Sequence, residues 1–336
     1  MEEKALRLSA VFLMILTAVS FALLPKLPAL HTWEVEAREE RIAEEEFAQS
    51  QVTMQNLKIK EQNEAAGAKG ELSIRLPEGV TGDQIAVSND YVTQTIRVEI
   101  PQADRTYFDS YPVLGNSDYI DGLSYTRQGE TGVIEVTTNK VYELQTEYDT
   151  QNFYFNFLTP HEVYDKVVVI DAGHGGRAVG ANKQGINEKD IDLAIVLKLK
   201  EIFDNSDQNI GVYYTRTDDS NPTFDQRVQL ANKSDADLFI SIHNNSTRSG
   251  RMSGTSGTQV MYDETSEASR QFAQICLEEV TDRIGSRDKG LVEGDSIYII
   301  RTSEVPVALI EVGFMTNKDE LEKLNSDAYQ RETAEG

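Results

Sequence analysis

Residues 166–176 read KVVVIDAGHGG, an uninterrupted apolar run that ends in a glycine-rich turn containing His174. A strand that is apolar on both faces is typical of a parallel sheet covered by helices on each side. Helical and strand patterns continue to alternate in the rest of the chain. The predicted helices cover 188–205, a segment from 222, and 266–284, and the further strands cover 210–215, 237–243, 297–300 and 307–312. This alternation predicts an α/β domain with a mainly parallel sheet and helices on both faces.

Side chains that can carry chemistry lie where the predicted strands end. His174 follows the first strand, His243 ends a later one, and Glu188 begins a helix. The carboxyl ends of parallel strands meet at one edge of a sheet, so we expect the two imidazoles to lie together there. Glu311 is the only charged residue in the apolar strand VALIEV, and a buried carboxylate needs a partner or a function.

The combination of two histidines with carboxylates predicts a catalytic metal site. Two imidazoles and one carboxylate are a common ligand set for catalytic zinc, which leaves one position for water. A further carboxylate beside them can accept and return protons. A cysteine-based zinc site is excluded, because the chain has a single cysteine, Cys276. The residues by themselves therefore predict a zinc hydrolase.

Seven segments of the chain resemble, in order and spacing, the zinc-dependent N-acetylmuramoyl-L-alanine amidases of the amidase-3 family. They are VVIDAGHGG, INEKD, YTRTDD, FDQRVQLAN, DADLFISIHNN, SGTQVMYD and VALIEVGFMTN, and they lie within residues 166–329. The resemblance implies that His174, Glu188 and His243 bind one zinc ion and that Glu311 is catalytic. It also implies the substrate, the amide between N-acetylmuramic acid and L-alanine in peptidoglycan.

The chain departs from the family pattern in three places. Asn244 stands where the family usually has alanine, and Asn244 and Arg301 are candidates for substrate binding. The loop between His243 and Thr258 is too short for the helix that blocks the zinc in some division amidases, which predicts an open site. The family's last helix usually runs further than Gly336, so we expect a shortened carboxyl end.

The amino-terminal part of the chain predicts a membrane element. Residues 8–25 are uncharged and follow Lys4 and Arg7, which predicts a single-pass helix in a bacterial cell membrane. The same charges place the amino terminus in the cytoplasm and the catalytic domain outside it. Secretion after cleavage of a signal peptide is the alternative.

Composition divides the chain into four regions. Residues 1–30 are the predicted anchor or signal peptide, and the acidic residues 31–70 are expected to form a solvated helical or disordered stalk. Alternating apolar residues over 71–160 predict a small all-β domain, which weakly resembles the AMIN-type modules that precede such amidases. The zinc amidase domain is predicted over 161–336.

Charge and position restrict the partners. The 32 lysines and arginines against 56 acidic residues give a net charge of −24, which argues against nucleic-acid binding. GHGGRA, residues 173–178, fits a dinucleotide pattern, but a loop follows it instead of a helix, and we expect no nucleotide cofactor. Peptidoglycan and the membrane are the expected partners. Two alternatives to the amidase are a zinc peptidase that cuts the stem peptide and an inactive protein that binds peptidoglycan.

Overall fold

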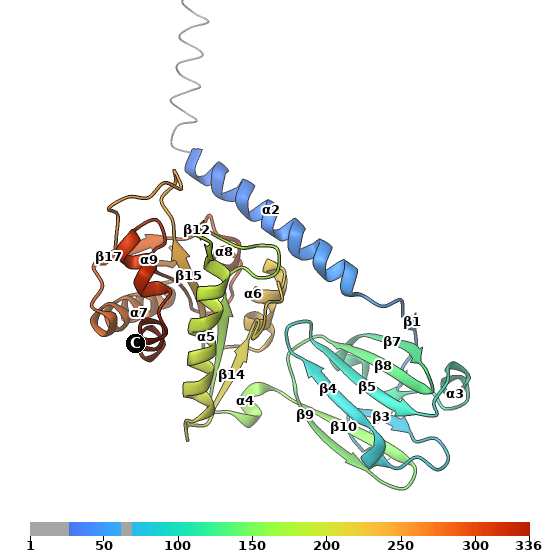
Figure 1. Cartoon of the computed structure of the whole chain (residues 1–336). Helices are drawn as coiled ribbons and strands as arrows, with labels where there is room; N and C mark the ends of the chain where they lie inside the picture. The colour runs from blue at the N-terminus through green and yellow to red at the C-terminus, as the bar shows by residue number, and fades with distance from the viewer. Residues whose placement is uncertain (1–26, 62–68) are drawn as a thin grey trace, which may run out of the picture.

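The computed structural model describes residues 27–61 and 69–336, and the side chains of its first helix from residue 34 onward. A long helix, α2 (Leu27–Ser50), is followed by a β sandwich and then by an α/β domain (Figure 1). The membrane helix predicted over 8–25 lies outside the described residues. Within the ranges that are described, no helix is both long and apolar enough to cross a membrane.

The α/β domain is built on a six-stranded sheet with the strand order β14-β11-β15-β18-β16-β17. These strands are β11 (Lys166–Ala172), β14 (Ile210–Tyr214), β15 (Leu238–Asn245), β16 (Thr258–Tyr262), β17 (Asp288–Glu293) and β18 (Val307–Phe314). All neighbours in the sheet pair in parallel except β16 and β18, which are antiparallel. The prediction of a mainly parallel sheet is confirmed, and the antiparallel junction is a feature that the pattern did not predict.

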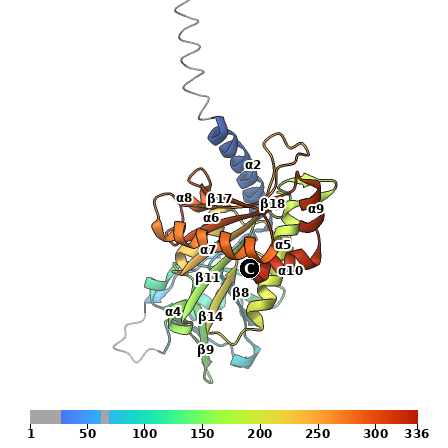
Figure 2. The same cartoon turned by 90° about the vertical axis from the view of Figure 1, so that its left-hand side faces the viewer.

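Helices cover both faces of this sheet (Figure 2). Alternate residues of a strand point to opposite sides. Val168 and Ile170 of β11 belong to a core that includes α5, α7, α9 and α10, while Val167 and Val169 belong to a core that includes α6 and α8. The helices are α5 (Glu188–Asp204), α6 (Phe224–Lys233), α7 (Glu267–Ile284), α8 (Tyr298–Arg301), α9 (Lys318–Leu324) and α10 (Asp327–Glu335). A two-residue hairpin, β12 (Asn182–Lys183) with β13 (Ile186–Asn187), precedes α5.

The strand predicted over 297–300 is wrong, because the chain forms the short helix α8 there. The sequence IYII favours a strand by local propensity. Ile299 and Ile300 are instead buried in the core formed with α6 and β18, and this packing decides the local conformation. The edge of the sheet is formed by β17, a strand that the sequence pattern did not predict.

The β sandwich consists of two five-stranded sheets with the orders β1-β7-β8-β5-β4 and β2-β6-β3-β10-β9. The first sheet contains β1 (Gln55–Asn56), β4 (Ala86–Asp90), β5 (Thr95–Pro101), β7 (Ile120–Gln128) and β8 (Thr131–Thr138). The second contains β2 (Lys60–Glu61), β3 (Leu72–Arg75), β6 (Leu114–Gly115), β9 (Glu143–Tyr148) and β10 (Asn152–Leu158). Three short helical segments accompany them: α3 (Arg105–Ser110) within the sandwich, η3 (Gly82–Gln84) and η4 (Ser117–Tyr119). Since β1 and β2 belong to these sheets, the sandwich begins earlier than residue 71.

Helix α2 does not form the solvated stalk that its composition predicted. It runs along the α/β domain, and its carboxyl end leads into β1 of the sandwich (Figure 1). Its glutamates contact the α/β domain, as in the bond from the main-chain N–H of Tyr298 to Glu36 at 2.7 Å. Charged side chains can cover a charged or polar surface as well as face water, and composition alone does not distinguish the two.

Candidate active site

His174 lies in a glycine-rich turn directly after β11. Its φ angle is +57°, and Gly175 and Gly176 follow with φ angles of +134° and +52°, a backbone that glycine adopts without strain. Gly173 is needed for space, because a Cβ atom there would lie 2.4 Å from the ring of His243. The turn therefore brings the two imidazoles together, with their ring centroids 4.8 Å apart.

Two buried arginines bind the main chain of this turn. Arg227 of α6 donates hydrogen bonds to the main-chain oxygens of Ala172 at 2.7 Å and His174 at 2.6 Å. It also pairs with the carboxylate of Asp171 at 2.7 Å. Arg216 donates to the oxygen of Ala172 at 3.0 Å. Both arginines thus brace the loop that carries His174.

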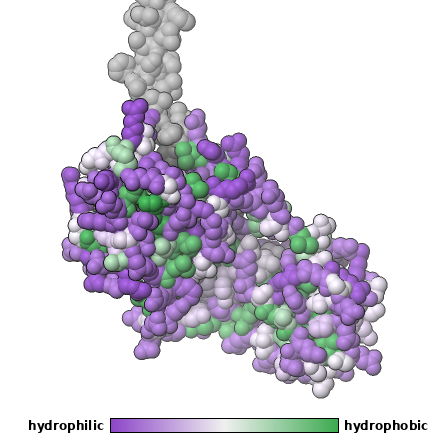
Figure 3. Space-filling view, viewed as in Figure 1, coloured by the Kyte–Doolittle hydropathy of each residue, from purple (hydrophilic) through white to green (hydrophobic). Residues whose placement is uncertain are grey.

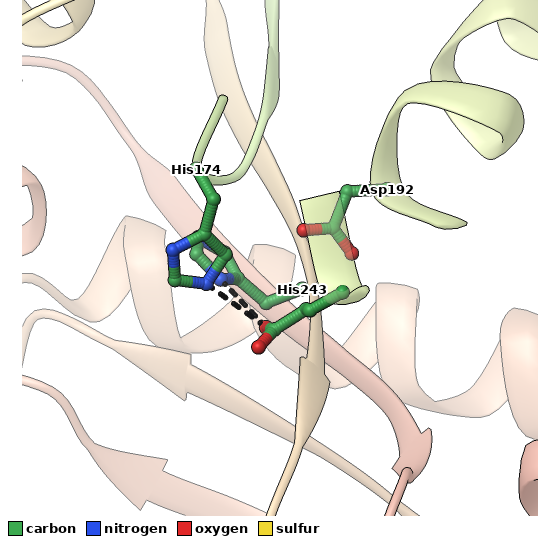
Figure 4. A group of neighbouring side chains, drawn as sticks. His174, Asp192 and His243 are labelled. Atoms are coloured by element: carbon green, nitrogen blue, oxygen red, sulfur yellow. Dashed lines mark hydrogen bonds and ion pairs between the residues drawn. The ribbon is translucent and has the colours of Figure 1, made fainter. Parts of the chain in front are cut away.

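Glu188, the first residue of α5, joins the two imidazoles. Its Oε1 lies 3.1 Å from Nε2 of His174 and 3.2 Å from Nδ1 of His243. The dashed lines of Figure 4 mark these two contacts of the labelled histidines. Oε1 also accepts a hydrogen bond from the main-chain N–H of Asn244, and Oε2 accepts one from that of Ala181. Burial opposes ionisation of Glu188, but the neighbouring imidazoles outweigh it and lower its pKa below the ordinary value.

Asp192 belongs to the same group, although the sequence did not single it out (Figure 4). It lies one helical turn after Glu188, so the two side chains share a face of α5. Its Oδ1 accepts a hydrogen bond from the amide of Asn244 at 2.7 Å, and its buried Oδ2 has no partner among the described residues. Burial, followed by the charge of Glu188, raises the pKa of Asp192 well above its ordinary value. The spacing of four residues was the available signal, but it is common on exposed helices.

Glu311 stands beside the imidazoles on the neighbouring strand. In the parallel pairing of β15 with β18, it is the partner of His243. Its Oε2 is buried and makes no hydrogen bond within the described part of the chain. Burial, followed by the charge of Glu188, raises the pKa of Glu311 to about 8. A carboxyl group in this range can hold and release a proton near neutral pH.

The side chains at this edge of the sheet fit a metal ion. One ligand atom each from His174, Glu188, Asp192 and His243 lies within 4.8 Å of the others. Nitrogen and oxygen donors of this kind suit zinc. Nε2 of His174 and Nδ1 of His243 both face Oε1 of Glu188, at 3.1 and 3.2 Å, so the three residues can share one ion.

Glu39 of α2 reaches the same place from outside the α/β domain. Its Oε2 lies 3.2 Å from Nδ1 of His174. Burial opposes protonation of His174, but Glu188 and Glu39 raise its pKa well above the ordinary value. The expectation of an open site is therefore wrong. The loop after β15 contains no helix, as expected, but α2 covers the site instead.

The two predicted substrate residues lie at different depths. Asn244 is 1% exposed, and its amide is bonded to Asp192. Arg301, the last residue of α8, lies nearer the surface, over the ring of Tyr298 and 3.7 Å from the carboxylate of Glu36. The structure thus brings His174, Glu188, His243 and Glu311 together, and substrate binding by Asn244 or Arg301 stays a prediction.

Imidazoles and buried carboxylates at the carboxyl ends of parallel strands are the arrangement of an α/β hydrolase domain that uses a metal ion. Residues 168–336 match the family profile described as N-acetylmuramoyl-L-alanine amidase. The chain belongs to this family.

Individual relatives match about half of the chain. The uncharacterized protein YqiI of Bacillus subtilis (strain 168) is 38% identical, over 51% of this chain and 80% of its own length. N-acetylmuramoyl-L-alanine amidase CwlM of Bacillus licheniformis is 32% identical, over 50% of this chain and 64% of its own, so the chain spans less than two thirds of that relative. The crystal structure of an N-acetylmuramoyl-L-alanine amidase from Clostridium difficile 630 is 34% identical over 51% of this chain and 91% of its own, with a TM-score of 0.48.

Proposed function

We propose that the chain is a peptidoglycan amidase that hydrolyses the bond between N-acetylmuramic acid and L-alanine. The observation that carries this proposal is the convergence of two imidazoles and Glu188 at one sheet edge, with Glu311 on the adjacent strand. Membership of the amidase family and the similarity to CwlM support the choice of substrate.

The residues of the site suit one zinc ion, which His174, Glu188 and His243 would hold. Bound zinc supplies a water molecule whose pKa is lowered to about 7. Asn244 positions this ligand set, because its main-chain N–H donates to Oε1 of Glu188 while its side-chain amide donates to Asp192. Partners of this kind hold a ligand in its binding orientation.

Glu311 is the proton carrier in this proposal. Its buried Oε2 accepts a proton from the attacking water and delivers it to the nitrogen of the departing L-alanine as the C–N bond breaks. The raised pKa suits this double role, since the group must be a base in one step and an acid in the next. A cation bound nearby brings this pKa closer to neutrality.

Glu311→Gln tests this role, because the amide keeps the size of the side chain but cannot carry the proton. We expect release of stem peptides from purified peptidoglycan to fall by about 100-fold or more, while zinc content stays near one ion per chain. Mass spectrometry of the digest identifies the bond that is cut. Cleavage within the stem peptide would show that the chain is a peptidase and not an amidase. A wild-type chain that binds zinc and peptidoglycan without cutting it would show that the chain is an inactive binding protein.

We also propose that the chain is anchored in the membrane with its α/β domain outside the cytoplasm. The support is the uncharged stretch 8–25, which follows Lys4 and Arg7. Membrane fractionation of the native protein is expected to recover the full-length chain with the membrane. A soluble form that begins near Leu23 would show that the segment is a cleaved signal peptide and not an anchor.

A further inference from the structure

Helix α2 lies against the α/β domain (Figures 1 and 2). The side chains that contact the domain are mainly acidic. Positions on one side of a helix recur every three or four residues. The contacting face follows this spacing and consists of Glu36, Glu39, Glu40, Ala43 and Glu46. Ala43 is 3% exposed, and it is the only buried residue of 34–50. A packed helix usually buries an apolar stripe, whereas α2 is held mainly through carboxylates.

Two of these carboxylates bind main-chain N–H groups at the start of helices in the α/β domain. Glu36 accepts a hydrogen bond from Tyr298 at 2.7 Å and lies 3.7 Å from the guanidinium of Arg301. Glu40 accepts one from Phe224, the first residue of α6, at 2.6 Å. N–H groups at the start of a helix lack a partner within the helix, so a carboxylate is a strong acceptor for them.

The carboxyl end of α2 binds the turn that carries His174. Glu46 accepts hydrogen bonds from the main-chain N–H of Arg177 at 3.1 Å and from its Nε at 3.0 Å, and also from the amide of Asn221. Glu45 pairs with the same arginine at 3.1 Å. The helix is therefore fastened on both sides of the candidate metal site.

Glu39 lies between these two groups of contacts, against His174. Its side chain is only 19% exposed, so its charge needs compensation from a nearby cation. A histidine that binds a metal is neutral and cannot compensate it. A divalent ion held by two neutral imidazoles and the carboxylate of Glu188 keeps one positive charge, which Glu39 can neutralise.

We propose that Glu39 holds His174 in its metal-binding orientation through Nδ1, while Nε2 faces Glu188, and that α2 excludes substrate while it is docked. The identity of the metal site rests on the proposed function. The donors that α2 occupies, among them Tyr298 N–H, Arg301 and Arg177, suit carboxylates. Stem peptides carry carboxylates too, so the helix and the substrate compete for the same surface.

Glu39→Gln in the full chain tests this positioning of His174, with Glu44→Gln as the matched control. Glu44 is exposed on α2 and has no hydrogen bond or ion pair among the described residues. In the Co²⁺-substituted proteins, the visible absorption spectrum reports the coordination of the metal. We expect Glu39→Gln alone to change this spectrum and to weaken zinc binding about 10-fold in competition with a chelator. Identical spectra and affinities in all three chains would overturn the assignment.

A second variant tests the closing of the site without changing Glu39. The combined change Glu36→Gln, Glu40→Gln and Glu46→Gln removes negative charge from three docking contacts. We expect faster hydrogen exchange over α2 than in the Glu44→Gln chain, and at least a several-fold gain in peptidoglycan hydrolysis. Faster exchange over α2 without a gain in hydrolysis would overturn the exclusion of substrate by the docked helix.

The two readouts separate this inference from the proposed function. A spectral change with Glu39→Gln in a chain that never cuts peptidoglycan would support the positioning role of Glu39 and overturn the amidase. Hydrolysis by a wild-type chain whose spectrum and zinc affinity do not respond to Glu39→Gln would support the amidase and overturn the positioning role.

Discussion

At the scale of single residues, the buried pair of Asp171 and Arg227 supports the position of His174. The two side chains are 1% and 2% exposed. The Asp171 carboxylate also accepts hydrogen bonds from the hydroxyls of Thr215 and Ser241, both at 2.6 Å. Burial opposes ionisation, but Arg227 and then these hydroxyls outweigh it and lower the pKa of Asp171 to about 2. The pair therefore fixes the end of β11, from which the turn with His174 starts.

Asp171→Asn is expected to lower the free energy of unfolding by about 3–5 kcal/mol, because it leaves the charge of Arg227 buried without its partner. Urea denaturation followed by circular dichroism measures this loss. Asp207→Asn, on an exposed loop, is the control and should change stability by less than about 0.5 kcal/mol. A loss below about 1 kcal/mol for Asp171→Asn would mean that the pair does not hold the turn.

The same carboxylate predicts sensitivity to acid. Its folded pKa lies below the ordinary value, so its stabilisation is complete above about pH 4 and is lost as the pH falls towards 2. The lowered pKa corresponds to about 2 kcal/mol of stability. Denaturation at a series of pH values should show the wild type losing about this part of its advantage over Asp171→Asn between pH 4 and 2. A constant difference over this range would contradict the lowered pKa.

Gly173 carries a steric requirement of the site. A Cβ atom at this position would overlap the imidazole of His243, 2.4 Å away, so Gly173→Ala must displace one of the proposed ligands. We expect zinc affinity to fall by about 10-fold or more, measured by chelator competition. Gly254→Ala is the control, because a Cβ atom there has no neighbour within 4 Å. Equal zinc affinities in the two variants would show that the site relaxes around the added methyl group.

At the scale of elements, α6 places Arg227 against the turn that follows β11. Its first turn is closed by a capping box, in which the hydroxyl of Thr223 accepts from the N–H of Gln226, and the side chain of Gln226 accepts from the N–H of Thr223. The next N–H, from Phe224, binds Glu40 of α2. The start of α6 is therefore held both by its own capping box and by a contact with the distant helix α2.

Thr223→Ala should lower the free energy of unfolding by about 1 kcal/mol, since it removes the cap of α6. Thermal unfolding measures the change, and Thr223→Ser, which keeps the hydroxyl, should restore most of the stability. Equal losses for alanine and serine would assign the effect to the methyl group of threonine and not to the cap.

The elements also show which predictions a sequence supports. Strands β11, β15 and β18 and helices α5 and α7 follow apolar patterns that are long enough to define their type, and their positions are confirmed. Helix α8 has only four residues, and its packing overrides the propensity of its sequence. Strand β17 has mostly exposed or partly exposed residues, so it carries no apolar pattern from which to predict it.

At the scale of the whole molecule, the β sandwich contacts the α/β domain through hydrogen bonds and through packed apolar side chains. Glu143 of β9 accepts hydrogen bonds from the hydroxyls of Tyr91 at 2.8 Å and Tyr213 at 2.6 Å. The two tyrosine rings lie edge to face with centroids 4.9 Å apart. Val141 of the sandwich is buried in the core that contains α6. One carboxylate thus connects a side chain from each domain.

Glu143→Ala should loosen this contact, because it leaves two largely buried hydroxyls without an acceptor, at a cost of about 1–3 kcal/mol. Limited proteolysis of the linker over 159–165 and small-angle X-ray scattering should show freer domains. Glu147→Ala, an exposed change on the same strand, is the control. An unchanged cleavage rate in Glu143→Ala would mean that other contacts hold the domains together.

The large negative charge of the chain has a structural use. Residues 34–46 contain seven glutamates, and five of them, Glu36, Glu39, Glu40, Glu45 and Glu46, contact the α/β domain. Composition predicted that this segment faces water, because exposed acidic helices are common. The face of the molecule visible in Figure 3 is mostly hydrophilic. Part of the acidic surface of α2 nevertheless faces inward, against N–H groups and an arginine of the α/β domain.

The sequence by itself determined the α/β class, the edge of the sheet at which the site forms, and four residues that meet there. Each follows from local information, since strand periodicity and the residues at strand ends need no knowledge of distant contacts. Only the tertiary structure decided that Asp192 joins the group, that Asn244 is buried against it and that Glu39 reaches His174. Glu39 and His174 are 135 positions apart in the sequence, and a contact of this length depends on how two folded parts dock. An acidic helix can face water or pack against a surface of unpaired hydrogen-bond donors. Only the folded α/β domain supplies such a surface.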